Sequence, residues 1–131
     1  MTGNTMDIQL LTTHLSVSPQ ILVSEMQALS EAGFKSIICN RPDGEGPGQP
    51  RFAEIAAAAS QYGLQAQYLP VESGNVLNED GQAFGQLLST LPGPVLAYCR
   101  TGMRSSTLWS LSQSGMTPQQ QILEASQKVS E

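Results

Sequence analysis

The feature that most constrains the fold of this chain is the regular alternation of short apolar runs with segments of helical spacing. Strands are predicted over residues 8–17 (one or two short strands), 34–39, 64–71 and 92–99. Helices are predicted from Pro19 to Gly33 with Ser18 as the N-cap, over 51–62 and 79–90, from about Arg104 to Gly115, and over 118–129. Strands separated by helices indicate an α/β fold, a three-layer sandwich with a mainly parallel central sheet and helices on both faces. We expect one domain over residues 1–131, because this length suits a single hydrophobic core.

Three of the predicted loops follow strands, over residues 40–50, 72–78 and 99–104. The first contains three prolines and three glycines, so it is neither a helix nor a central strand. In parallel sheets the carboxyl ends of the strands meet at one edge, where ligands bind. We therefore expect Arg41, Cys99, Arg100 and Arg104 to gather there and to form a positive site for a small anion.

The charge balance and the cysteine count exclude several classes of protein. Six basic and eleven acidic residues give a net charge of −5, which disfavours nucleic-acid binding. No apolar stretch approaches the length of a membrane span and the N-terminus lacks a signal-peptide pattern, so we expect no membrane partner and a cytoplasmic location. Two cysteines and one histidine make neither a disulfide framework nor a metal-ligand set. No nucleotide-binding glycine motif follows the first strand, so we expect no metal and no cofactor.

The stretch YCRTGMRS, residues 98–105, carries the candidate chemistry. A short loop between a strand and a helix turns its backbone N–H groups inward and forms an anion-binding nest. The partial positive charges of these N–H groups also lower the pKa of a cysteine, because they stabilise its thiolate. Cys99 is therefore a candidate nucleophile. Arg104 can hold an oxyanion with two parallel hydrogen bonds, so Cys99 and Arg104 are the predicted catalytic residues. The predicted substrate contacts are Arg41, Arg100, Thr101, Gly102, Met103 and Ser105.

This stretch resembles the active loops of two classes of cysteine enzyme. Protein tyrosine and dual-specificity phosphatases carry C-x-x-x-x-x-R, usually with a histidine before the cysteine. Rhodanese-like sulfurtransferases carry a loop one residue shorter, often C-R-x-G-x-R. Here Tyr98 precedes Cys99 and four residues separate Cys99 from Arg104, so the loop length matches the sulfurtransferases.

Two longer motifs, NRPDGEGPGQP at 40–50 and GPVLAYCRTGMRSSTLW at 93–109, resemble the phosphatase-like domain of bacterial beta-lactamase hydrolase-like proteins. The resemblance covers roughly residues 6–115. It implies the cysteine-phosphatase-like sandwich fold of the dual-specificity phosphatases. It also implies a link to sulfide oxidation, because members accompany or are fused to persulfide dioxygenases, and such an enzyme is a predicted partner.

Loop length favours sulfur over phosphorus. A phosphatase loop must curve around three phosphoryl oxygens. A loop one residue shorter encloses a narrower space, which still accommodates a terminal sulfane sulfur. We therefore predict a rhodanese-like sulfurtransferase that works through a Cys99 persulfide. Arg100 and Arg104 would orient a small anionic donor, thiosulfate or a polysulfide, and a small thiol such as glutathione would accept the sulfur.

Two alternatives stay open. A cysteine-dependent phosphatase would act through a phosphocysteine and would need an acid to protonate the leaving alcohol, with Glu72 and Asp43 as candidates. A non-catalytic anion- or partner-binding domain would keep the loop only as a scaffold. The role of Cys39 is also open, between core packing and resolving a persulfide or disulfide with Cys99.

Overall fold

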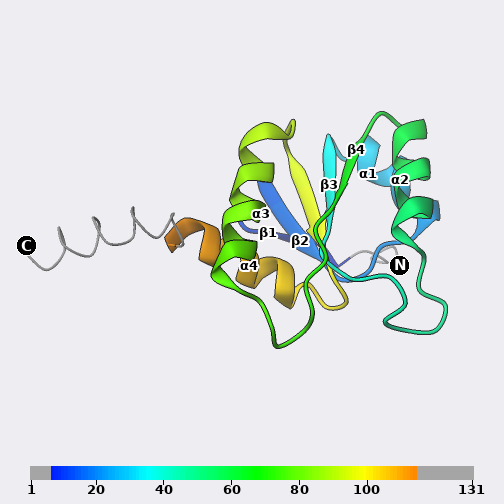
Figure 1. Ribbon diagram of the computed structural model, residues 1–131. Helices are drawn as coiled ribbons and strands as arrows, with labels where there is room; N and C mark the ends of the chain where they lie inside the picture. The colour runs from blue at the N-terminus through cyan, green and yellow to red at the C-terminus, as the bar shows by residue number, and fades with distance from the viewer. Residues whose placement is uncertain (1–6, 115–131) are drawn as a thin grey trace, which may run out of the picture.

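A five-stranded sheet lies at the centre of the computed structural model, which describes residues 7–114 (Figure 1). The strands are β1 (Gln9–Leu10), β2 (Leu15–Ser18), β3 (Ser36–Cys39), β4 (Gln65–Tyr68) and β5 (Val95–Tyr98). Their order across the sheet is β1-β2-β5-β3-β4. β1 runs antiparallel to β2, and the other neighbouring pairs are parallel. The last of these strands in the sequence, β5, therefore lies in the middle of the sheet.

Helices cover both faces of this sheet. They are the short 3-10 helix η1 (Val23–Glu25), α1 (Met26–Glu31), α2 (Phe52–Gln61), α3 (Asn78–Thr90) and α4 (Met103–Ser114). Figure 1 shows α1 and α2 on one face and α3 and α4 on the other. Within residues 7–114, no helix combines the length and the apolar character that a membrane crossing requires. The predicted helix over 118–129 lies outside the described residues.

The core is divided by the sheet because successive residues of a strand point to opposite faces. Ile37 belongs to the cluster beneath α1 and α2, whereas its neighbour Ile38 belongs to the cluster beneath α3 and α4. Every residue of β3 and β5 is buried, as is typical of parallel strands that are covered on both faces. The α/β sandwich predicted from the sequence is thus the architecture observed.

The predicted helix start at Ser18 and Pro19 is wrong. Ser18 is the last residue of β2, and its hydroxyl donates to the Pro19 carbonyl at 2.9 Å instead of capping a helix. Residues 19–22 are not helical, so no helix begins at Pro19 for Ser18 to cap. Helical structure begins only with η1, where the Glu25 carboxylate accepts from the Leu22 N–H at 2.7 Å.

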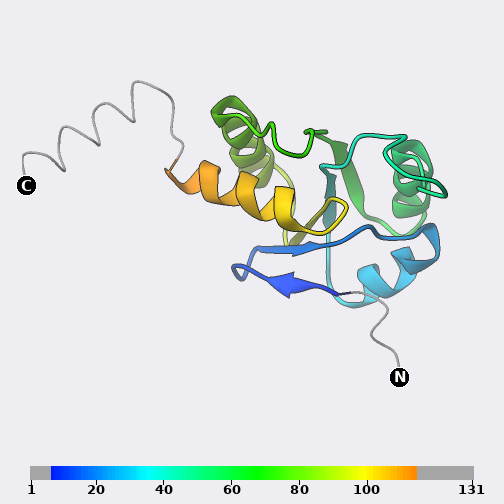
Figure 2. The ribbon, with the colours of Figure 1, turned by 90° about the horizontal axis from the view of Figure 1, so that it is seen from below.

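The carboxyl ends of the parallel strands bring distant loops together. The segments that follow β3, β4 and β5 lie at the lower edge of the sheet in Figure 1, and Figure 2 views this edge from below. Hydrogen bonds join them: the Asn40 N–H donates to the Tyr98 carbonyl at 2.8 Å, and the Val71 N–H donates to the Asn40 carbonyl at 3.0 Å. The expected meeting of the three loops is therefore present in the structure.

Candidate active site

Cys99 directly follows β5, so the sheet determines the position of its backbone. The residue has no exposed surface (0%). Its Sγ accepts a hydrogen bond from the Gly102 N–H at 3.0 Å. Gly102 has a φ of 97°, a left-handed conformation that favours glycine, and a Cβ there would lie 3.4 Å from the backbone carbonyl carbon of Ser18. The glycine thus allows the loop to fold back towards the thiol.

The pKa of the Cys99 thiol is lowered despite its burial. Burial is the largest single influence and raises the pKa, because it disfavours the charged thiolate. Hydrogen bonds from backbone N–H groups outweigh it, and these groups belong to Ser105, Thr101, Gly102 and Arg104. Arg104 and Ser105 lie in the first turn of α4, where N–H groups have no partner within the helix. The loop and the helix start together favour the thiolate, as a nucleophile requires.

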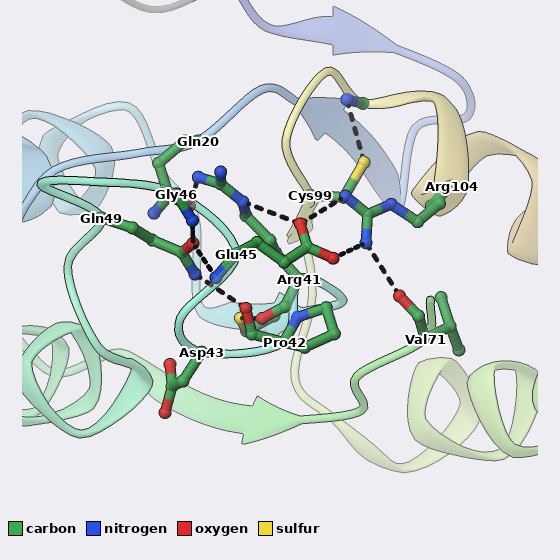
Figure 3. Close-up of polar contacts among 12 residues, drawn as sticks. Gln20, Arg41, Pro42, Asp43, Glu45, Gly46, Gln49, Val71, Cys99 and Arg104 are labelled. Atoms are coloured by element: carbon green, nitrogen blue, oxygen red, sulfur yellow. Dashed lines mark hydrogen bonds and ion pairs between the residues drawn. The ribbon is translucent and has the colours of Figure 1, made fainter. Parts of the chain in front are cut away.

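Arg104 is almost buried, with 8% exposed, and lies beside this thiol. Its Nη1 donates to Oε2 of Glu45 at 2.7 Å and to the Val71 carbonyl at 2.9 Å, and its Nη2 donates to Oε1 of Glu45 at 2.9 Å (Figure 3). The hydrogen bond to Glu45 raises the pKa of Arg104, and the Cys99 thiolate adds to this effect. The two predicted catalytic residues are therefore neighbours, and the guanidinium stays charged.

Glu45 is a site residue that sequence reasoning missed. It accepts from Arg104 and also from Nε of Arg41, at 3.1 Å, while Nη1 of Arg41 donates to the Gln20 side chain at 3.0 Å (Figure 3). The Arg104 hydrogen bond is the main cause of the lowered pKa of Glu45. The sequence feature that could have indicated Glu45 is its position inside the motif NRPDGEGPGQP. Two guanidinium groups around one carboxylate leave a net positive charge beside the thiolate.

The two candidate acids are placed differently. Asp43 lies away from Cys99 and Arg104 in Figure 3, and its Oδ1 accepts from the Phe52 N–H at the start of α2, at 2.8 Å. Glu72 is exposed and directly follows Val71, whose carbonyl binds Arg104. Asp43 therefore binds the first N–H of α2, whereas Glu72 is exposed in the segment after β4, next in sequence to a residue that contacts Arg104.

Three of the other predicted substrate contacts, Arg100, Thr101 and Met103, line a hollow of about 650 Å³ next to Arg104, whereas Gly102 and Ser105 are not part of its lining. Its lining includes Arg100, Thr101, Met103, Arg104 and Glu45, together with Ser73, Gly74, Val76 and Thr107. Met103 is the most exposed large apolar side chain of this lining, with 72% exposed. This volume is sufficient for a small ester with an anionic head group.

The second cysteine, Cys39, is a core residue. It pairs with Tyr98 in the sheet and packs in the cluster beneath α1 and α2. Its thiol donates to the Arg41 carbonyl at 3.2 Å, and burial raises its pKa. Both cysteines are free, and among residues 7–114 no group of three or more His, Cys, Asp or Glu side chains could hold a metal ion.

Comparison with known proteins assigns the chain to a family. The model of the phosphatase-like domain of beta-lactamase hydrolase-like proteins matches residues 7–116. The chain belongs to this family. It is 38% identical over 99 residues to the beta-lactamase hydrolase-like protein of Agrobacterium fabrum and 37% identical over 99 residues to that of Xylella fastidiosa. These alignments cover 76% of this chain but 23% of each relative, so the chain spans about a quarter of their length.

Solved structures support the same family placement. A Neisseria meningitidis protein provisionally described as a phosphatase is 38% identical, with a TM-score of 0.77 over 91% of this chain and 86% of that chain. P. aeruginosa TpbA in complex with pTyr is 15% identical, with a TM-score of 0.64 over 93% of this chain and 73% of that chain. At this identity TpbA shows only that the family shares its fold.

The predicted sulfur transfer is wrong. The matched family model is phosphatase-like, and the Neisseria structure at 38% identity is provisionally described as a phosphatase. The physical reason is that the residue count stopped at Arg104. Ser105 also directs its backbone N–H at Cys99, so the donor ring extends beyond the counted loop into α4. The four-residue spacing from Cys99 to Arg104 therefore does not by itself indicate sulfur chemistry.

Proposed function

We propose that this domain is a cysteine-dependent phosphatase that hydrolyses phosphate monoesters through a phosphocysteine at Cys99. The observation that carries the proposal is the Cys99 thiol itself, whose pKa is lowered by a ring of backbone N–H groups beside the Arg104 guanidinium. Such a ring suits a transferring phosphoryl group, because the same donors stabilise negative charge on its oxygens. Membership of a phosphatase-like family supports the same reaction class.

The reaction would proceed in two displacements. The Cys99 thiolate attacks phosphorus, an S–P bond forms, and the P–O bond to the leaving alcohol breaks. A water molecule then attacks the phosphocysteine, which releases inorganic phosphate and restores the thiolate. Arg104 and the loop N–H groups would hold the phosphoryl oxygens throughout, so most of the catalysis comes from positioning and electrostatics.

An acid has to protonate the leaving alkoxide in the first displacement. We assign this role to Glu72, because it is exposed and directly follows Val71, whose carbonyl accepts from Arg104. Asp43 is assigned to fold stability instead, because its carboxylate is bound to the Phe52 N–H. The predicted persulfide dioxygenase partner and the cytoplasmic location stay predictions.

The direct test is hydrolysis of an aryl phosphate by the wild type, Cys99→Ser and Cys39→Ser. Cys99→Ser should abolish turnover, whereas Cys39→Ser is the matched control and should retain it, because Cys39 packs in the core. Acid quenching during turnover should trap one phosphoryl group on the peptide that contains Cys99. Turnover that survives Cys99→Ser would overturn the proposal.

A non-catalytic anion-binding domain is the second candidate, and one observation favours it. Cys99 has no exposed surface, and both Nη atoms of Arg104 are already bound to Glu45. In that case phosphate would bind without turnover of any ester. Cys99 would then also be alkylated no faster than free cysteine, a measurement that separates the two candidates.

A further inference from the structure

A completely buried asparagine, Asn40, lies directly after β3 and beside the cysteine loop. Burying an amide is costly unless each polar atom finds a partner, so its contacts indicate what it holds. Its backbone N–H donates to the Tyr98 carbonyl at 2.8 Å, and its backbone carbonyl accepts from the Val71 N–H at 3.0 Å. The backbone of Asn40 thus joins the ends of β3 and β5 to the segment after β4.

The side chain of Asn40 has one orientation that its partners allow. Its Nδ2 donates to the Leu69 carbonyl at 2.9 Å, and its Oδ1 accepts from Oγ of Ser105 at 2.8 Å. A carbonyl only accepts, so the amide NH2 must face Leu69. The amide oxygen then faces Ser105, whose hydroxyl has to donate. The hydroxyl proton of Ser105 is therefore committed to Asn40 and is not directed at Cys99.

Ser105 is itself fully buried and uses its two donors in different directions. Its backbone N–H is foremost among the groups that stabilise the Cys99 thiolate, while its hydroxyl is held by Asn40. We propose that Asn40 is a positioning residue for the nucleophile: by holding the Ser105 hydroxyl it keeps the first turn of α4 in place, so that the N–H groups of Ser105 and Arg104 face the sulfur. The consequence for catalysis rests on the proposed function, whereas the contact chain does not.

The test compares Asn40→Ala, Ser105→Ala and the double variant. The rate of alkylation of the Cys99 peptide is followed against pH by mass spectrometry. Each single change should raise the pKa of the Cys99 thiol. At a pH below this pKa, alkylation should slow by roughly three- to tenfold, which corresponds to the loss of about one hydrogen bond. The double variant should be no worse than either single variant, because both break the same chain. Ser112→Ala is the matched control, since it removes a serine hydroxyl bond to the Trp109 carbonyl further along α4.

The opposite sign would overturn the proposal. If the Ser105 hydroxyl acted directly on the sulfur, Asn40→Ala would release that hydroxyl and would lower the pKa of Cys99 or leave it unchanged. Additive effects in the double variant would also exclude a shared chain.

If Asn40→Ala does not fold, a second measurement on Ser105→Ala still tests the proposal. In Ser105→Ala, hydrogen exchange of the backbone amides of residues 101–105 should accelerate, because the helix start loses its anchor. A raised pKa with unchanged exchange, or no change in either, would overturn the proposal. Neither measurement uses a substrate, so failure here is distinct from failure of the hydrolysis assay.

Discussion

Both Nη atoms of Arg104 are bound to the carboxylate of Glu45, at 2.7 and 2.9 Å. The pair links α4 to the loop after β3, across 59 positions of sequence. Because this carboxylate binds both Nη atoms, it fixes the orientation of the guanidinium plane and so the direction of the N–H groups that are not bound to Glu45. Glu45 therefore sets both the charge and the orientation of the predicted oxyanion contact.

Glu45→Gln should destabilise the fold, because it removes the charged partner of two arginines. Its side chain is 25% exposed, so solvent screens part of the interaction. We expect a loss of about 1–2 kcal/mol in the free energy of unfolding, measured by urea denaturation. Glu79→Gln, an exposed acid in the first turn of α3, is the control and should change this value by less than about 0.5 kcal/mol.

The same pair predicts a pH dependence. The pKa of Glu45 is lowered from its usual 4.5 in the folded state. Its contribution is therefore fully present above pH 4.5 and is lost as the pH falls through the lowered value. The difference in unfolding free energy between the wild type and Glu45→Gln should shrink across this acid window. A difference that stays constant would show that the carboxylate charge is not involved.

The two cysteines should titrate in opposite directions from the usual thiol pKa of 9.0. Cys99 should ionise below this value and Cys39 above it, because backbone donors stabilise the first thiolate and burial disfavours the second. Ultraviolet absorbance of the thiolates should show two transitions. Cys99→Ser should remove the lower one, and Cys39→Ser should remove the upper one. Loss of the lower transition in Cys39→Ser would reverse the assignment.

Gly102→Ala should damage the site more than the fold. The left-handed φ should cost about 1–2 kcal/mol in the free energy of unfolding. The shifted loop should also raise the pKa of Cys99, because the Gly102 N–H donates to its sulfur. Gly63→Ala is the matched control, with a φ of 78° and open space around it. It should show a similar loss of stability and an unchanged Cys99 pKa.

Substitutions of Glu72 and Asp43 should have different effects on the rate of hydrolysis. Glu72→Gln should slow hydrolysis of an alkyl phosphate by roughly a hundredfold or more, because a poor leaving group needs the proton. The nitrophenyl ester should be affected much less. Asp43→Ala should leave kcat within about twofold and cost about 1 kcal/mol of stability through the lost bond to Phe52. An equal loss of kcat in both variants would contradict the assignment of roles.

The placement of Cys99 and Arg104 was predictable because a strand, a tight loop and a helix start define it locally. The meeting of the loops was also predictable, since parallel strand ends share one edge of the sheet. The helix start at Ser18 was not, because the strand extends to Ser18 through its pairing with Tyr98 of β5, a tertiary contact.

Glu45 and Asn40 lay beyond local reasoning for a related reason. Glu45 stands in a loop without periodicity, where only its bond to Arg104 reveals its role. Asn40 follows a buried strand and resembles any loop polar residue until its contact with Ser105 is seen. The expectation of sulfur chemistry failed because it rested on a single residue count, whereas the whole domain matches a phosphatase-like family.

The central place of β5 has a consequence for assembly of the chain. β2 pairs with β1 and β5, and β3 pairs with β4 and β5, so without residues 95–98 the described strands could pair only as two separate two-stranded ribbons. A two-stranded ribbon is marginally stable alone. Pairing of β5 with both β2 and β3 therefore joins the sheet, and because Cys99 directly follows β5, the same pairing places the thiol beside the loops after β3 and β4. The strand that completes the sheet is thus also the strand that positions the nucleophile.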